Sequence, residues 1–128
     1  MRKNPCAGSS KKKIQVPSEE AEQVAFVEYL ERVGMIYHAS PNGGKRHIKT
    51  ALRMKRLGCK PGFPDVMIFN PTKDGRAGLA IEMKRRSGGK VSELQREWIN
   101  NLNRCNWACA ICCGFDEAAA VFLSHYTR

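Results

Sequence analysis

The sequence predicts an α/β fold in which one mixed sheet of four strands is flanked by helices, in the order α-β-α-β-β-α-β-α. Short apolar segments of strand length alternate with longer segments of helical periodicity. Two of the apolar segments are joined by an eight-residue turn, which indicates a hairpin. The length of 128 residues suits a single domain with one core. Because helices come before, between and after the strands, we expect them to cover both faces of the sheet.

The first helix is expected to begin after Ser18, whose hydroxyl can cap it, and to end at Gly34. Glu19 follows in the first turn, where a carboxylate suits the positive end of the helix dipole. A basic segment precedes this helix. We therefore divide the chain into a flexible basic arm over residues 1–17 and a folded domain over residues 18–128.

Turn residues and prolines separate the remaining elements. A Ser-Pro-Asn-Gly-Gly cluster ends the first strand, and Gly58 stops the second helix. The predicted elements after the first helix are a strand at 35–39, a helix at 47–57, strands at 65–70 and 79–84, a helix at 92–104, a strand at 107–113 and a helix at 116–126.

The charge is strongly positive and unevenly distributed. The net charge is +10, and neither residues 1–17 nor the stretch between Glu31 and Asp65 contains an acidic residue. A field of one sign attracts polyanions and speeds their capture. We therefore favour nucleic acid as the partner over a helix that is basic only for solubility. After Arg32, the basic residues of the second stretch are Lys45, Arg46, Lys49, Arg53, Lys55, Arg56 and Lys60.

Composition gives no support to a membrane or secreted protein. The chain lacks the run of ~18 apolar residues that a membrane span needs. Its basic N-terminus is followed by no apolar stretch of the kind that secretory signals contain. A soluble, cytoplasmic protein is the expectation.

Six cysteines raise the hypothesis of a structural zinc site near the C-terminus. The cluster at Cys105, Cys109, Cys112 and Cys113 lacks the two separated CxxC pairs that make this signal specific. It also lies in an apolar segment typical of a buried strand. Packing of reduced cysteines in the core is the favoured interpretation.

The residues most suggestive of chemistry are Asp65, Glu82 and Lys84, on the two strands of the predicted hairpin. Side chains alternate along a strand, so Glu82 and Lys84 share a face and Met83 points the opposite way. With the turn near residue 74, Asp65 lies across from Glu82 or its immediate neighbour. Alone, a Glu-x-Lys match is also typical of a solvated surface hairpin. The apolar strands that adjoin these residues favour an active site.

Two buried carboxylates side by side require a cation. Mg2+ or Mn2+ suits oxygen ligands, and the backbone carbonyl of Met83 is a further expected ligand beside Asp65 and Glu82. Such an ion activates water and polarises a phosphate. Lys84 is expected to orient the attacking water or to neutralise the charge that grows on phosphorus.

The first helix offers a third carboxylate. Helical periodicity predicts an apolar face formed by Val24, Phe26, Val27, Leu30 and Val33. Gln23 falls near the centre of this face, Glu19 lies one turn before it, and Glu22 lies at the edge. We favour Glu19 over Glu22 as the acid that is directed at the metal. The alternative is that Glu19 only satisfies the helix dipole.

Two further features have a local and a functional interpretation. Ser92 and Gln95 form a capping-box pattern, and Gln95 could equally contact the active site. The glycine-rich loop with Asn42, Lys45 and Arg46 could approach a phosphate or serve as an ordinary turn. Both interpretations remain open for each feature.

Together these segments resemble the VRR-NUC branch of the PD-(D/E)xK nuclease superfamily. The motifs that carry the resemblance are SEEAEQVAFVEYL, HASPNGGKR, ALRMKRLGCKPG, PGFPDVMIF, LAIEMKR and SELQREWINNL, which extend over about residues 18–115. The resemblance implies a restriction-endonuclease-like core and cleavage that depends on Mg2+ or Mn2+.

Residue by residue, the resemblance implies that Asp65 and Glu82 bind the metal and that Lys84 is the catalytic lysine. Glu19 matches the glutamate of the first helix, and Gln95 matches the glutamine of the helix that follows the hairpin. Arg85 and Arg86 follow the lysine, and we expect them to contact nucleic acid. Lys49 and Arg53 of the basic helix are expected to do the same.

In size the chain is similar to stand-alone, phage-type members of this family, which resemble Holliday-junction resolvases and act as homodimers. The leading hypothesis is therefore a structure-selective endodeoxyribonuclease that acts on branched DNA such as four-way junctions. The alternative is a non-catalytic basic DNA-binding module, which would bind DNA in a salt-sensitive way without turnover. A zinc-stabilised interaction domain is a third hypothesis.

Overall fold

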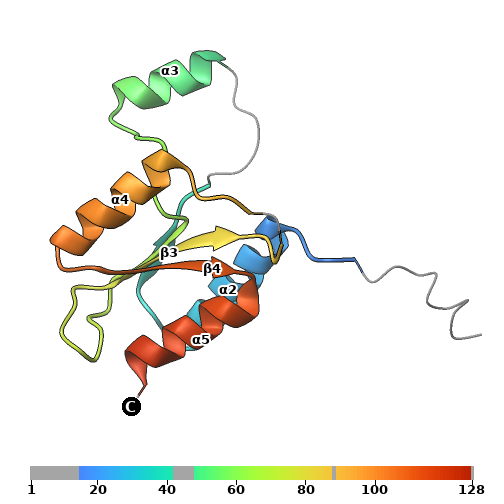
Figure 1. Cartoon of the computed structure of the whole chain (residues 1–128), viewed down its shortest axis with the longest axis vertical. Helices are drawn as coiled ribbons and strands as arrows, with labels where there is room; N and C mark the ends of the chain where they lie inside the picture. The colour runs from blue at the N-terminus through green and yellow to red at the C-terminus, as the bar shows by residue number, and fades with distance from the viewer. Residues whose placement is uncertain (1–14, 42–47, 88, 128) are drawn as a thin grey trace, which may run out of the picture.

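The computed structural model describes residues 15–41, 48–87 and 89–127 (Figure 1). Its element order is the one the sequence predicts, and each predicted element lies within two or three residues of its expected ends. The elements are α2 (Glu19–Arg32), β1 (Tyr37–Ala39), α3 (Ile48–Arg56), β2 (Val66–Ile68), β3 (Leu79–Lys84), α4 (Glu93–Arg104), β4 (Ala108–Cys113) and α5 (Phe115–Tyr126).

The four strands form one mixed sheet in the order β1-β2-β3-β4. β2 is antiparallel to both β1 and β3, so the predicted hairpin is confirmed. β3 and β4 are parallel and are connected through α4. In the hairpin Val66 lies opposite Ile81, and the same register continued by one residue places Asp65 opposite Glu82.

Helices cover both faces of the sheet, as expected. On one face α2 and α5 pack against each other and against β3. There the fully buried side chains of Phe26, Leu30, Ile81 and Met83 form the main core, with Phe122 of α5. On the other face, α4 covers a smaller cluster centred on Met67, Ala80 and Leu102, with the half-buried rings of Phe63, Trp98 and Trp107 at its margin.

The buried face of α2 differs from the one that its periodicity predicts. Glu22, Phe26 and Leu30 are buried, whereas Val24 is 50% exposed and Val33 is also exposed. The interior side of the helix therefore begins with an acid rather than a valine. The physical reason is a distant partner, Arg86, which forms an ion pair with Glu22 and stabilises its carboxylate inside the protein.

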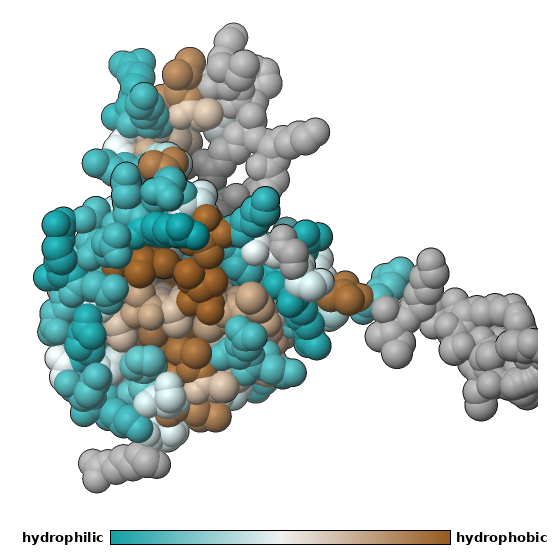
Figure 2. All heavy atoms as spheres, viewed as in Figure 1, coloured by the Kyte–Doolittle hydropathy of each residue, from teal (hydrophilic) through white to brown (hydrophobic). Residues whose placement is uncertain are grey.

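Helix α3 stands apart from the sheet and its covering helices (Figure 1). Within the described part of the chain, no strand or other helix packs extensively against it. Arg53, Lys55, Arg56 and the following Lys60 are exposed. Figure 2 shows this projection as a mixture of hydrophilic and a few hydrophobic atoms. It is therefore a basic surface element rather than part of the core.

The cysteines of the C-terminal strand do not converge. Cys112 is fully buried in the main core, whereas Cys109 packs against the cluster under α4 on the opposite face. Cys105 is exposed at the end of α4. Cys6 lies outside the described residues. Because neighbouring strand positions point to opposite faces, these thiols cannot share one zinc ion.

None of the described helices has the length and apolar character needed to cross a membrane.

Candidate active site

Asp65 and Glu82 lie together at one end of the β2–β3 hairpin. Asp65 directly precedes β2, and Glu82 belongs to β3. Their exposed fractions are 2% and 4%. An Asp65 carboxylate oxygen accepts a hydrogen bond of 2.7 Å from the backbone N–H of Met83. This bond holds the side chain of Asp65 across the hairpin, next to Glu82.

The environment of Glu82 opposes its ionisation. Burial is the largest cause and the negative charge of Asp65 the next, and together they raise the pKa of Glu82 to about 8, against the lowering effect of Lys84. Glu82 Oε1 is buried without a hydrogen-bond partner among the described residues. A buried oxygen of this kind is costly unless a proton or a cation joins it.

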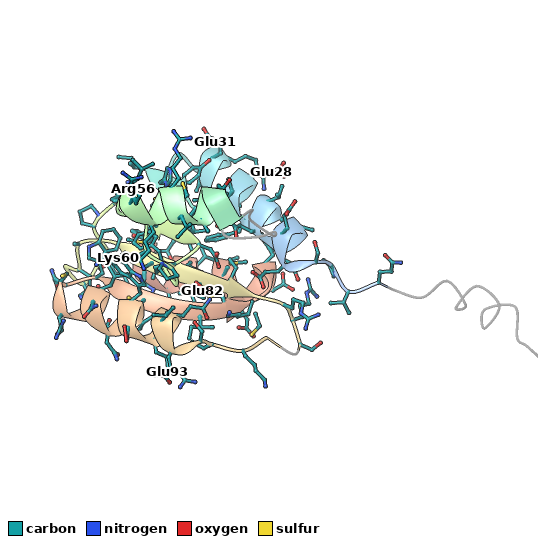
Figure 3. The ribbon with its side chains drawn as sticks, turned by 90° about the horizontal axis from the view of Figure 1, so that it is seen from above. Glu28, Glu31, Arg56, Lys60, Glu82 and Glu93 are labelled. Atoms are coloured by element: carbon teal, nitrogen blue, oxygen red, sulfur yellow. The ribbon has the colours of Figure 1, made fainter. Side chains whose placement is uncertain are left out.

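Lys84 lies two residues further along β3, on the same face as Glu82. Its Nζ is 3.5 Å from Glu82 Oε2 and donates a hydrogen bond of 3.0 Å to Gln95 Oε1. The three side chains therefore form a closed polar cluster, because Gln95 Nε2 also donates to Glu82 Oε2 over 2.8 Å. Figure 3 shows Glu82 inside the molecule, whereas Glu28, Glu31 and Glu93 lie at its periphery.

Gln95 has both of the roles that its position in the sequence suggests. It completes the capping box of α4, since its Oε1 accepts a 2.9 Å hydrogen bond from the backbone N–H of Ser92. The Ser92 hydroxyl accepts in return from the backbone N–H of Gln95. The same amide contacts Glu82 and Lys84. One side chain thus links the start of α4 to the acid–lysine cluster.

Glu19 lies in the first turn of α2 and lines a groove with Asp65. The volume of this groove is about 580 Å3. A second groove of about 610 Å3 lies between Glu19, Arg85 and the chain that leads into α2. Burial raises the pKa of Glu19, and Asp65 raises it further, whereas Lys84 and Arg85 lower it. Glu19 is therefore close enough to interact electrostatically with the hairpin cluster.

The carboxylate of Glu22 is bound by Arg86 and by the backbone of Phe115 rather than directed at the hairpin acids. Its carboxylate is 2.6 Å from Arg86 Nε and accepts a 3.0 Å hydrogen bond from the backbone N–H of Phe115. The hydrogen bond from Arg86 is the main reason that the pKa of Glu22 lies below its ordinary value. Of the two first-helix acids considered from the sequence, Glu19 is the one placed beside Asp65. Sequence reasoning missed the burial of Glu22, because its partner lies 64 positions away.

The arrangement fits a hard divalent cation, although its acids do not form a complete cage. Within the described residues, no group of three or more His, Cys, Asp or Glu side chains is close enough to hold a metal ion. Asp65 and Glu82 nevertheless supply adjacent carboxylates, and Glu82 Oε1 has no hydrogen-bond partner in the described part of the chain. Oxygen ligands of this type suit Mg2+ or Mn2+, which bind through one or two carboxylates and retain several waters.

The expected nucleic-acid contacts are distributed around this cluster. Asn42, Lys45 and Arg46 lie outside the described residues. Lys49 and Arg53 belong to α3, where Arg53 is exposed. Arg85 is exposed beside Glu19. Arg86 is also partly exposed, but its guanidinium is engaged by Glu22.

A mixed sheet whose hairpin carries two buried acids and a lysine is the arrangement that the resemblance to VRR-NUC nucleases implies. Comparison with known families identifies the family of the chain. The model of the VRR-NUC domain matches residues 11–116, and the chain belongs to this family. VRR-NUC domains are generally nucleases that depend on a divalent metal.

A solved structure supports the same fold. A VRR_NUC domain protein is 23% identical and superposes with a TM-score of 0.71. The match covers 88% of this chain and 90% of that chain. Comparison with curated proteins gives no match.

Proposed function

We propose that the protein is a Mg2+- or Mn2+-dependent endonuclease that hydrolyses phosphodiester bonds of branched DNA. The observation that carries the proposal is the pair of buried carboxylates at Asp65 and Glu82, with Lys84 alongside. One oxygen of Glu82 has no hydrogen-bond partner among the described residues. A protein that only binds DNA has no need of two acids in a position that repels phosphate. A divalent cation held by these acids would reverse the sign of the local electric field, and the site would then attract a phosphate group.

The proposed ligands are Asp65, Glu82 and the backbone carbonyl of Met83, with Glu19 as a further acid. Met83 lies between the two site residues of β3, and its own side chain is directed into the core. When bound, the ion activates water and stabilises the charge on the reacting phosphate. The acids contribute by holding the ion and by limiting the space around it.

Lys84 is the proposed catalytic lysine. Its ammonium group is held by Gln95 and by Glu82, so it reaches the cluster in a defined orientation. From there it can orient the attacking water and offset negative charge on the phosphate oxygens. The water oxygen forms the new bond to phosphorus, and the bond from phosphorus to the leaving oxygen breaks. Gln95 positions Lys84 and Glu82 relative to each other.

DNA is proposed to lie against the exposed basic groups of α3 and against Arg85. These side chains are long, charged and without an acidic neighbour within α3, which suits contacts to phosphates rather than to base edges. Recognition by backbone contacts favours selection by DNA shape. We propose four-way junctions as the preferred shape and a homodimer as the active form, because a two-fold symmetric junction is cut symmetrically by two related sites.

The test is a cleavage panel of linear, flap, splayed and four-way DNA in Mg2+, Mn2+ or EDTA. The parent protein is expected to cut in either metal and not in EDTA, with a preference for branched substrates. Asp65→Asn and Lys84→Ala should lower the rate by about 100-fold or more. Lys73→Ala is the control, because Lys73 lies in the loop at the opposite end of the hairpin. Salt-sensitive binding without turnover in any metal would instead identify a DNA-binding module.

A further inference from the structure

A half-buried ion pair joins α2 to the segment that directly follows β3. The side chain of Glu22 in α2 is 3% exposed. Its Oε2 accepts from Arg86 Nε over 2.6 Å, and its Oε1 is 3.4 Å from Arg86 Nη2. Two of the three guanidinium nitrogens therefore face one carboxylate. Such a two-point contact fixes orientation as well as distance.

The pair connects three elements. Glu22 Oε1 also accepts a 3.0 Å hydrogen bond from the backbone N–H of Phe115, at the start of α5. The preceding Gly114 donates from its backbone N–H to the carbonyl of Lys84 over 3.0 Å. A Cβ at Gly114, which has φ of 95°, would lie 2.9 Å from Glu22 Oε2. Glycine is therefore required there for the carboxylate to approach the backbone.

Each member of the pair is a near neighbour in sequence of a proposed site residue. Glu22 lies three residues after Glu19, and helix geometry places both on nearly the same side of α2. Arg86 lies two residues after Lys84, just beyond the end of β3. The pair consequently fixes the rotation of the first turn of α2 relative to the end of β3. That rotation determines how far Glu19 lies from Asp65 and Lys84.

We infer that the Glu22–Arg86 ion pair is a positioning pair, which holds Glu19 against the Asp65–Lys84 cluster and thereby sets the affinity of the site for a divalent cation. The inference rests on the proposed function of that cluster. It assigns the half-exposed guanidinium of Arg86 to Glu22 rather than to DNA, in contrast to Arg85. The adjacent arginines thus have different tasks, although the sequence presents them as equivalent.

The pair acts through geometry, because Glu22 is engaged by Arg86 and Phe115 rather than by the cation. Loss of the guanidinium leaves a buried carboxylate with only a backbone partner, so α2 must rotate or Glu22 must take up a proton. Either response displaces the first turn. Outer groups that orient metal ligands typically affect metal affinity by about 10- to 100-fold. Because the effect here passes through a helix turn, we expect about 10-fold weaker cation binding.

The experiment compares Arg86→Met with Arg85→Met in the full chain. Mn2+ binding is measured by titration calorimetry, and DNA binding by fluorescence anisotropy in EDTA at several salt concentrations. We expect Arg86→Met to weaken Mn2+ binding about 10-fold and to leave the salt dependence of DNA binding unchanged. Arg85→Met should lose about 0.9 from the slope of log K against log salt. It should not weaken Mn2+ binding, because it removes a positive charge that acts on Glu19.

Two more variants separate positioning from loss of stability. Glu22→Gln retains the shape and the bond from Phe115 but not the charge, and it should weaken Mn2+ binding in the same direction. Phe122→Leu lowers stability in the core without touching the pair, and it should leave the Mn2+ affinity unchanged. Unaltered Mn2+ binding in both Arg86→Met and Glu22→Gln, or a loss of salt slope in Arg86→Met equal to that in Arg85→Met, would overturn the inference.

Asp65→Asn distinguishes this inference from the proposed function. If Asp65→Asn binds Mn2+ as well as the parent does, the metal centre itself is misplaced and the proposed function fails. If Asp65→Asn loses Mn2+ binding while Arg86→Met and Glu22→Gln retain it, the metal centre stands and the positioning role is wrong.

Discussion

Substitution of Glu82 by Gln should make the metal-free protein more stable at alkaline pH than the parent. The pKa of Glu82 rises from an ordinary 4.5 to about 8 in the folded protein. Between pH 4.5 and about pH 8, the carboxyl group of Glu82 is ionised in the unfolded chain but remains protonated in the folded protein. Unfolding therefore releases a proton, and the stability that Glu82 contributes at low pH is lost as pH rises to about 8.

The free energy of unfolding falls by about 1.4 kcal/mol for each pH unit, or by about 5 kcal/mol between pH 4.5 and about pH 8. Urea unfolding in EDTA at several values between about pH 5 and 8.5 measures this loss. Glu82→Gln cannot ionise, so its stability relative to the parent should increase steadily across the window. Glu22, whose pKa is lowered, acts below its ordinary value of 4.5 and outside this window.

A cation should replace the proton at the same oxygen. Binding of Mn2+ near pH 7 should therefore release about one proton per ion, which is measured as a dependence of the calorimetric heat on the ionisation enthalpy of the buffer. Glu97→Gln, an exposed substitution in α4, is the control and should release protons like the parent. The reasoning is refuted if the stability difference between parent and Glu82→Gln does not change with pH.

Two further predictions concern the groups around the hairpin. Gln95→Leu removes the return bond of the capping box and the bridge from Lys84 to Glu82. The free energy of unfolding should fall by about 1 kcal/mol. The cleavage rate should fall by a larger factor than the affinity for DNA. Gln95→Glu should retain more of the capping-box contact with Ser92 than Gln95→Leu does, but it adds a negative charge beside Asp65 and Glu82. If both variants cleave DNA as fast as the parent, the contact of Gln95 with Lys84 and Glu82 is not needed for cleavage. The double variant Arg53→Ala and Arg56→Ala should weaken binding of all DNA shapes alike and reduce the salt slope by about 1.8, with Mn2+ affinity unchanged. A loss confined to one DNA shape would mean that α3 recognises geometry rather than charge.

The element order and the central pair of acids could be predicted from the sequence because their signals are local. Ser18 and Ser92 each cap a helix where the sequence places one, and the side chain of Ser18 accepts from the backbone N–H of Ala21. The hairpin turn fixes the register, and the register places Asp65 opposite Glu82. Both features depend on residues that are near in sequence or joined by a short turn.

The buried face of α2 could not be predicted in the same way. Periodicity favours Val24 and Val33 as interior positions, yet the side chain that is enclosed is Glu22. A carboxylate can enter a core only when a cation and N–H donors meet it there. Those groups belong to Arg86 and Phe115, which tertiary folding brings to α2 from distant parts of the sequence. No local pattern contains this information.

The side-chain amide of Gln95 couples the motion of the first turn of α4 to the orientation of Lys84. Because the same oxygen accepts from Ser92 and from Lys84, the first turn of α4 cannot fray without releasing the ammonium group. The orientation of Lys84 therefore persists only as long as that turn remains wound. Hydrogen exchange at the Ser92 amide would report, in the absence of any substrate, how often the lysine is set free.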